Sequence, residues 1–240
     1  MKRTLLLALL LASVAFAGYP NFAARWRFQN SGLDCSGFGH NLTVNGTGAF
    51  ANARGQRVLY FDGTGDYCSL SGFALSGSVV WVAFWTRSKT YAADIQCFIG
   101  DNAASSTVGY LRFQRNANSS NVIFYYAEGT SNSRGAQYLS YFAGAYNDAW
   151  VFVSVICDYT GKVIYWYRNG VYLSSTAMAN TPVFPSTSRT RYVGSYSTTA
   201  YLLQDSYLGD FRWGTLAAYP GRAIADASVA RLYAGGMPTW

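Results

Sequence analysis

The sequence predicts an all-β fold, a two-sheet antiparallel jelly-roll sandwich with one short C-terminal helix. Three observations lead to this prediction. Short aromatic and β-branched runs follow one another along the chain, Gly- and Asn-rich turns separate them, and no helical stretches alternate with them. The 240 residues are 50% hydrophobic and only 12% charged, so the chain can bury a substantial core.

The first 17 residues have the pattern of a signal peptide. Lys2 and Arg3 provide a positive n-region, residues 5–14 form an apolar h-region, and Ala15-Phe16-Ala17 is a small-x-small cleavage motif. An uncleaved anchor is the alternative, but the apolar stretch is shorter than the roughly 20 residues that span a bilayer. We therefore expect an exported single domain over residues 18–240, with no membrane span after cleavage.

The first predicted strand covers residues 25–29. Trp26 and Phe28 share one of its faces and polar residues alternate with them, which is the period of two that half-buried strands show. Similar runs predict strands at residues 58–61, 67–70, 78–86, 95–99, 110–115, 122–127, 137–142, 150–158, 163–168, 191–194 and 207–213. Gly and Asn at the breaks tolerate the left-handed backbone of tight turns.

Two turns and one helix complete the predicted elements. Thr160-Gly161 joins two strands as an antiparallel hairpin, and Asn169-Gly170 marks a second turn. Near the end of the chain Asp226 is expected to cap a short helix. Its apolar residues Val229, Leu232 and Tyr233 recur at helical spacing, and Gly235-Gly236 stops it.

Ten short motifs, in this order and spacing, are similar to one family of recognition modules. They are Trp26-Arg27-Phe28, Asp34-Cys35-Ser36-Gly37, Phe61-Asp62-Gly63, Asp66-Tyr67, Phe84-Trp85, Trp150-Val151-Phe152-Val153, Tyr167-Arg168-Asn169-Gly170, Val193-Gly194, Leu208-Gly209-Asp210-Phe211-Arg212 and Arg231-Leu232-Tyr233. Through nearly all of residues 18–240 the chain resembles the laminin G-like, concanavalin A-like jelly-roll family.

The resemblance implies a module that binds carbohydrate, protein or lipid surfaces, and some members hold calcium at the edge of the sandwich. One block departs from the family pattern. The usual second acidic residue is replaced in Gly209-Asp210-Phe211-Arg212, which weakens the transfer of a polar role to this block.

The sequence argues against an enzyme. Glycosidases on related sandwiches need two closely spaced carboxylates, and the chain has a single glutamate, Glu128, beside a turn glycine. Hydrolysis by Ser or Cys generally needs a histidine base, and the only histidine, His40, lies in a Gly-rich turn.

The chain carries a formal net charge of +7, most of it from arginine. A basic surface could favour acidic polysaccharide, an anionic envelope or nucleic acid as a partner, and the alternative is an ordinary solvated basic surface. Because the arginines are scattered singly and no nucleic-acid motif is present, we expect no nucleic-acid binding.

Calcium is the only cofactor for which the residues make a case. Asp34, Asp62 and Asp66 lie in turn blocks where carboxylates and carbonyls could converge as oxygen ligands. Alternatively, these side chains hydrogen-bond their own turn backbones, as Asx turns do.

Four cysteines follow the leader, and an even count in an exported protein predicts disulfides. We expect Cys35 to pair with Cys68, since both flank the turn blocks, and Cys97 with Cys157, since both lie within strands. The other pairings, and a free buried Cys157, remain open.

An exposed row of tyrosine, arginine and glutamine is the predicted ligand site. Leu111 and Phe113 form the inward side of their strand, so Tyr110, Arg112 and Gln114 point outward. From the predicted strand at residues 137–142, Gln137 and Tyr141 join them in the predicted site. Flat rings with bidentate donors suit a sugar or an anionic glycan, although a solvated sheet face is the alternative.

These observations predict a secreted, non-enzymatic module that binds a glycan or a protein on a cell or envelope surface. The alternative is a structural subunit that self-assembles into an extracellular filament, surface layer or virion. Tyr-rich faces would then be subunit contacts.

Overall fold

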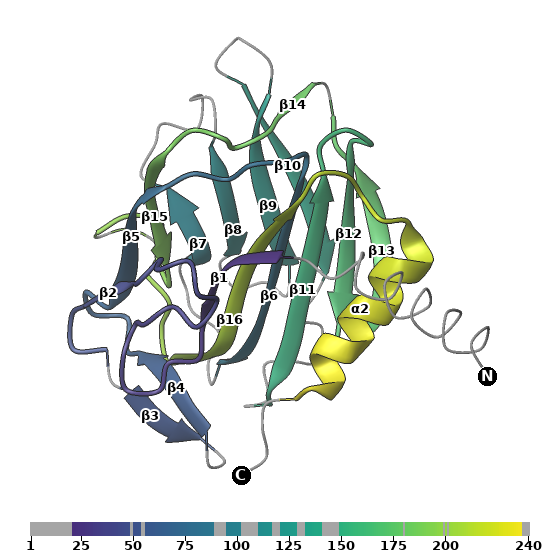
Figure 1. The fold of residues 1–240 in the computed structure, drawn as a ribbon. Coiled ribbons are helices and arrows are strands. Elements are labelled where there is room, and N and C mark those ends of the chain that lie inside the picture. Colours follow the sequence, from purple (N-terminus) through teal and green to yellow (C-terminus); the bar gives the residue numbers. More distant parts are fainter. Residues whose placement is uncertain are drawn as a thin grey trace, which may run out of the picture.

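The computed structural model describes residues 21–48, 50–53, 56–88, 95–101, 110–116, 121–128, 133–140, 149–179, 181–198, 200 and 202–236. These residues form two antiparallel sheets packed face to face, with helix α2 (Arg222–Ala234) across the outer face of one sheet (Figure 1). The predicted two-sheet sandwich with a C-terminal helix is confirmed. The predicted signal peptide lies outside the described residues.

Sheet A runs in the order β13-β12-β11-β6-β16-β4-β3, and β1 also pairs with β16. Its strands are β1 (Asn21–Trp26), β3 (Phe50–Ala53), β4 (Gln56–Phe61), β6 (Val79–Ser88), β11 (Val151–Asp158), β12 (Val163–Arg168), β13 (Val171–Ala177) and β16 (Ser206–Leu216). This order places β6 beside β16, although more than 100 residues separate them in the sequence.

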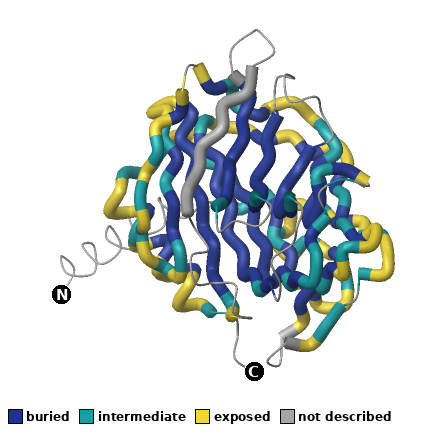
Figure 2. Tube along the Cα trace, turned by 180° about the vertical axis from the view of Figure 1, so that it is seen from behind, coloured by how far each residue is buried: buried dark blue, intermediate teal, exposed yellow. Residues whose placement is uncertain are grey.

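Sheet B runs in the order β10-β9-β8-β7-β15-β5-β2, and β14 pairs with β9. Its strands are β2 (Thr43–Asn45), β5 (Tyr67–Phe73), β7 (Gln96–Asp101), β8 (Leu111–Arg115), β9 (Asn121–Glu128), β10 (Ser133–Ser140), β14 (Pro182–Val183) and β15 (Arg189–Val193). In the view from behind, most of the described strands of this sheet are buried along their length (Figure 2).

Aromatic rings fill the space between the sheets. Phe84 and Phe211 stack with centroids 5.0 Å apart, and Trp26 contacts Phe211 at 5.9 Å. Trp213 meets Phe73 of sheet B edge to face at 5.2 Å. All five side chains are almost completely buried, and such rings dominate the hydrophobic stabilisation of a core.

Helix α2 covers part of the outer face of sheet A. Its buried Val229 and Leu232 belong to a cluster with Trp85 and Phe152, as their helical spacing predicts. The helix begins at Arg222, five residues before Ala227, where a helix capped by Asp226 would begin, and Gly235 ends it. Asp226 is therefore no cap, and its carboxylate instead accepts hydrogen bonds from Tyr167 and Arg222.

Most predicted strands occur, and both predicted turns are confirmed. β11 and β12 form the expected antiparallel hairpin, and Asn169 and Gly170 both have positive φ, at 51° and 81°. β2, β3, β13 and β14 were not predicted. The sequence did not predict β13 because its apolar residues, Val171 and Leu173, are exposed. Their alternation with other residues therefore marks no buried face of the strand. β10 begins four residues before the predicted range.

Candidate functional site

Asp34, the first predicted calcium ligand, organises the turn that follows β1. Its carboxylate accepts hydrogen bonds from the backbone N–H groups of Arg25 (2.9 Å), Ser36 (2.8 Å) and His40 (3.0 Å). Burial raises the pKa of the Asp34 carboxyl, but these hydrogen bonds outweigh burial and leave the pKa below its usual value.

Asp62 and Asp66 lie together in a second turn. Asp66 accepts a hydrogen bond from the Asp62 backbone N–H at 2.9 Å, and Asp62 accepts one from the Thr64 backbone N–H at 2.6 Å. Asp34 does not join them: the described residues contain no group of three or more His, Cys, Asp or Glu that could hold a metal ion. The predicted three-carboxylate calcium set is therefore not assembled, and these side chains form turns.

All four cysteines are free thiols, so the predicted disulfides Cys35–Cys68 and Cys97–Cys157 are wrong. Cys35 is exposed in a turn, whereas Cys68 is buried in the core. Cys97 lies opposite Gln114 in the pairing of β7 with β8, on the outer side of sheet B, while Cys157 packs in the core. In the predicted pair Cys35–Cys68, one thiol lies at the surface and the other in the interior. In the predicted pair Cys97–Cys157, the backbone of sheet B lies between the two thiols.

The predicted row on β8 faces in the expected direction but is not exposed. Leu111 and Phe113 enter the core, and Tyr110, Arg112 and Gln114 lie on the opposite side of sheet B. However, the exposed fractions of these three residues are only 0%, 5% and 0%. Of the other two predicted site residues, Gln137 has its backbone in β10 and Tyr141 lies outside the described residues.

Tyrosine rings surround the Arg112 guanidinium on the outer side of sheet B. Its carbon lies 4.3 Å from the ring centroid of Tyr125, 4.9 Å from that of Tyr196 and 5.8 Å from that of Tyr110. These are cation–π distances, and such contacts strengthen when water is excluded. The arrangement is a packed cluster that leaves little ring surface for a ligand.

A half-exposed row of similar chemistry lies on the outer face of sheet A. Tyr207 of β16 pairs in register with Tyr60 of β4 and with Arg87 of β6. The Tyr60 and Tyr207 centroids lie 4.8 Å apart, and the Arg87 guanidinium lies 5.7 Å from the Tyr207 ring. Trp150, just before β11, extends the row with its centroid 6.1 Å from that of Tyr207. We call Tyr60, Arg87, Trp150 and Tyr207 the open row.

All four residues of the open row are intermediate in exposure, so each keeps part of its surface accessible to solvent. A carboxylate adjoins them, because Asp205 accepts a hydrogen bond from the Tyr60 hydroxyl at 2.9 Å. Next to Tyr207 on the same strand face, Gly209 lies opposite Trp85 and has no side chain that could interrupt the surface.

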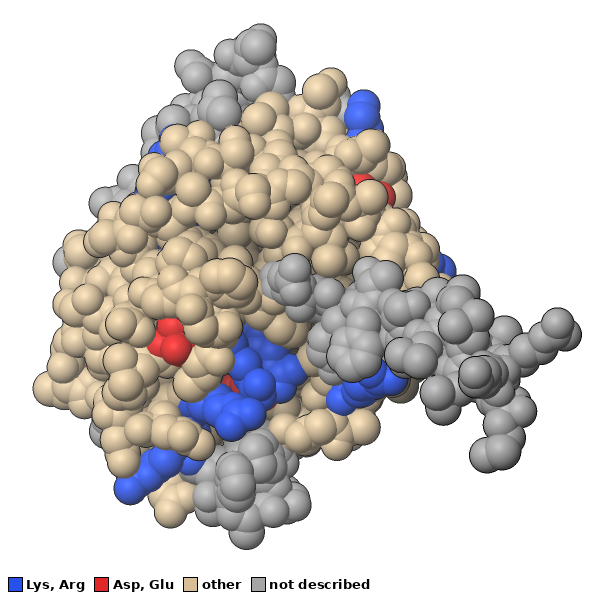
Figure 3. All heavy atoms as spheres, in the orientation of Figure 1, with Lys and Arg blue, Asp and Glu red and all other residues tan. Residues whose placement is uncertain are grey.

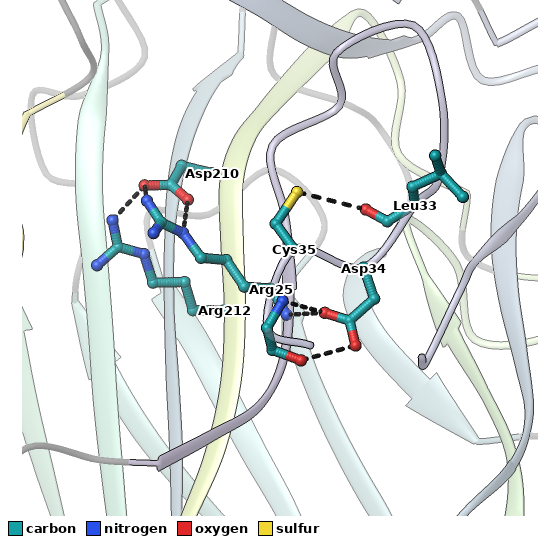
Figure 4. Close-up of polar contacts among 7 residues, drawn as sticks. Arg25, Leu33, Asp34, Cys35, Asp210 and Arg212 are labelled. Carbon is teal, nitrogen blue, oxygen red and sulfur yellow. Dashed lines mark hydrogen bonds and ion pairs between the residues drawn. The ribbon is translucent and has the colours of Figure 1, made fainter. Parts of the chain in front are cut away.

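An ion network lies farther along the same face. The Arg25 guanidinium donates to both carboxylate oxygens of Asp210, at 2.8 Å and 3.1 Å, and Arg212 donates to one of them (Figure 4). Burial raises the pKa of the Asp210 carboxyl, but the hydrogen bonds from the two arginines outweigh it and lower the pKa overall. With one anion between two cations, the network keeps one net positive charge.

The open row and the ion network share one face. Tyr207 pairs with Arg87 and Arg212 pairs with Ala83, four residues away on β6, so about 13 Å of strand separates the two features. Basic side chains gather over the face of sheet A beside the part that α2 covers (Figure 3). Side chains of the Arg25–Asp210 pair are 27% and 7% exposed, which places Arg25 at the surface above the buried carboxylate.

The sequence reasoning missed the open row. One signal could have found it: Tyr60 lies between the core residues Leu59 and Phe61, and Tyr207 precedes the core residue Leu208, so alternation turns both rings outward. The pairing that joins β4, β16 and β6 has no signal in a single sequence.

A separate open pocket of about 520 Å³ lies beside the turn that follows β1. It is lined by Phe38, His40, Ser76, Thr215 and mostly small residues. Among the described residues that line it, His40 is the one titratable side chain, so these residues provide no acid–base pair.

No protein-family model and no curated protein matches the chain, but its fold occurs in solved binding domains. The botulinum neurotoxin serotype D binding domain superposes with a TM-score of 0.67 at 13% identity, over 90% of this chain and 52% of that one. The botulinum neurotoxin type G receptor-binding domain superposes with a TM-score of 0.65 at 14% identity, over 89% of this chain and 51% of that one. The botulinum neurotoxin DC binding domain, solved in complex with rat synaptotagmin II, superposes with a TM-score of 0.65 at 15% identity, over 88% of this chain and 50% of that one.

The chain spans about half the length of these solved structures. At such identities the likeness shows a shared β-sandwich fold and carries over no site residue. In the described residues, no helix is both long and apolar enough to cross a bilayer.

Proposed function

We propose that the protein is an exported, non-enzymatic recognition module that binds an acidic glycan through the outer face of sheet A. We further infer that it is a distant relative of the laminin G-like modules, as its motifs indicate. The similarity to solved receptor-binding domains supports a binding role.

The open row is the observation that carries the proposal. Three half-exposed rings, of Tyr60, Tyr207 and Trp150, lie in line and offer the flat apolar surface on which a sugar ring stacks. Arg87 and Asp205 beside them supply a donor and an acceptor for hydroxyl groups.

The ion network favours an acidic sugar over a neutral one. Arg25 and Arg212 share one carboxylate, so a carboxylate or sulfate group on the ligand would meet net positive charge. With about 13 Å between the row and the network, a short oligosaccharide can contact both.

The test compares acidic and neutral oligosaccharides as ligands of the purified protein. Galacturonate oligomers supply carboxylates, sulfated dextran oligomers supply sulfates, and unmodified dextran oligomers are neutral. We expect the acidic ligands to bind at least tenfold more tightly, and Tyr207→Ala to weaken their binding at least tenfold.

A matched control is Tyr67→Ala. Tyr67 is also a half-buried tyrosine in a ring pair, 5.8 Å from Tyr192, but it lies on sheet B. The Tyr67→Ala variant should therefore bind the acidic oligosaccharides like the wild type. Absence of binding to any of the ligands, or equal losses in the two variants, would contradict the proposed function.

The leader is tested separately. If residues 1–17 are a signal peptide, the intact mass of the protein recovered outside the cell should correspond to residues 18–240. A full-length mass in that fraction would rule out cleavage.

A further inference from the structure

β13 forms one edge of sheet A. Among the described residues it pairs with β12 alone, so the backbone groups on its other side face away from the sheet (Figure 1). Natural edge strands are usually protected from pairing by charged residues or proline. The sequence of β13, Val-Tyr-Leu-Ser-Ser-Thr-Ala, contains neither, and its one irregularity is a register shift against β12 that makes Leu173 an extra, bulged residue.

Apolar side chains are exposed along this edge. The exposed large hydrophobics of the described chain number six, and four of them lie on β13 or α2: Val171 (64%), Leu173 (37%), Ile224 (41%) and Tyr233 (38%). Two contacts show that the two elements adjoin. A Cβ at Gly170 would lie 2.8 Å from the Tyr233 ring, and Arg222 lies 3.3 Å from the Tyr172 ring centroid.

The distribution of charge along this edge is compatible with a second copy of the chain as the binding partner. The chain carries a net charge of +7, so two copies repel each other unless they meet where charge is absent or balanced. β13 is uncharged, and the Arg222–Asp226 ion pair, with atoms 2.8 Å apart, balances the start of α2. The nearest cations on the hairpin, Arg168 and Lys162, lie on the β12 side of β13, away from its free edge, so a second copy can approach the edge without placing like charges directly opposite each other.

We propose that β13 pairs antiparallel with β13 of a second copy and joins the two A sheets into one. A two-fold axis at Ser174 would place Leu173 opposite Ser175, and Val171 opposite Ala177 of the other copy. Such an interface is isologous and closed, so it produces a dimer. This proposal is independent of the glycan site, which lies on β4, β6 and β16.

Sedimentation velocity over a concentration series tests the pairing. The wild type should be a dimer at micromolar concentration. Leu173→Lys places a charge at the edge and should weaken dimerisation at least tenfold. The control Leu33→Lys changes an apolar residue that is 59% exposed in the turn after β1, and it should remain a dimer.

Val171→Lys provides a second edge variant, and far-UV circular dichroism checks the folding of all three. A wild type that stays monomeric at every concentration overturns the proposal, even if the edge accepts a strand from another protein. A dimer unaffected by both edge variants overturns it as well, because the copies would then meet at another surface.

Discussion

Two arginines on opposite faces of the sandwich show how burial changes the meaning of one residue pattern. Arg112 of β8 lies 4.3 Å from the Tyr125 ring and is 5% exposed. Arg87 of β6 lies 5.7 Å from the Tyr207 ring and is only partly buried. Each projects from a strand onto tyrosine on the outer side of its sheet.

The comparison separates a packing role from the binding role that we propose. The surroundings of Arg112 are closed, so its cation–π contacts contribute to stability. Around Arg87 the rings keep an accessible side, so the same chemistry is available to a ligand. Alternation in the sequence predicts which way each side chain points, but it does not predict what lies above it.

Replacing Arg112 by alanine should have the largest effect on stability. The change removes a buried cation that contacts three tyrosine rings, and we expect a loss of about 2–3 kcal/mol. For a domain of this size the melting temperature would fall by roughly 5–10 °C. Calorimetry checks this against Arg57→Ala, an exposed arginine on β4. If Arg112→Ala and Arg57→Ala melted at the same temperature, the outer face of sheet B would be open to solvent around Arg112.

Replacing Arg87 by alanine should give the opposite result. The melting temperature should change by less than about 4 °C, because one partly exposed cation–π contact contributes roughly 0.5–1 kcal/mol. Affinity for acidic oligosaccharides should fall about fivefold to tenfold in titration calorimetry. A stability loss as large as that of Arg112→Ala would remove the distinction between the two faces.

Acid should weaken the ion network beside the open row. Because the pKa of Asp210 is lowered in the folded protein, its charge stabilises the fold above the unfolded pKa of about 3.9, and this contribution is lost as pH falls through the lower folded value. Urea unfolding between pH 5 and pH 3 should therefore show stability falling more steeply in the wild type than in Asp210→Asn. If the free energies of unfolding of the wild type and Asp210→Asn fell in parallel with pH, the Asp210 carboxylate would not contribute to the pH dependence of stability.

Thiol labelling tests the closure of sheet B without any mutation. Burial raises the pKa of the Cys97 thiol, which lies beside the Arg112 cluster, and buried thiols react slowly. Iodoacetamide should modify the exposed Cys35 in the native protein and all four cysteines after unfolding. Rapid native modification of Cys97 would contradict the closed face.

The sequence predicted the sandwich because local signals agree with the fold. Trp26 and Phe84 mark buried strand faces, and Asn169-Gly170 marks a turn, and both kinds of signal act over a few residues. β13 was missed because Val171 and Leu173 are exposed, so burial imposes no alternation on this strand.

The candidate site was only partly predictable. Tyrosine with arginine was the expected chemistry, and it occurs on both faces, but Tyr60, Arg87 and Tyr207 meet through pairing across more than 100 residues. Such pairing depends on the whole sheet. The disulfide prediction failed for a related reason, because spacing does not show which side of a sheet a cysteine faces.

Hydrogen–deuterium exchange with and without a galacturonate or sulfated dextran oligomer tests the central claim most directly. We predict that the ligand slows exchange in β4, around Arg87 in β6, and in residues 205–212, while β8 and β9 exchange as before. Slower exchange confined to β8 and β9, with β16 unchanged, would place the ligand on the opposite face and contradict the proposed site.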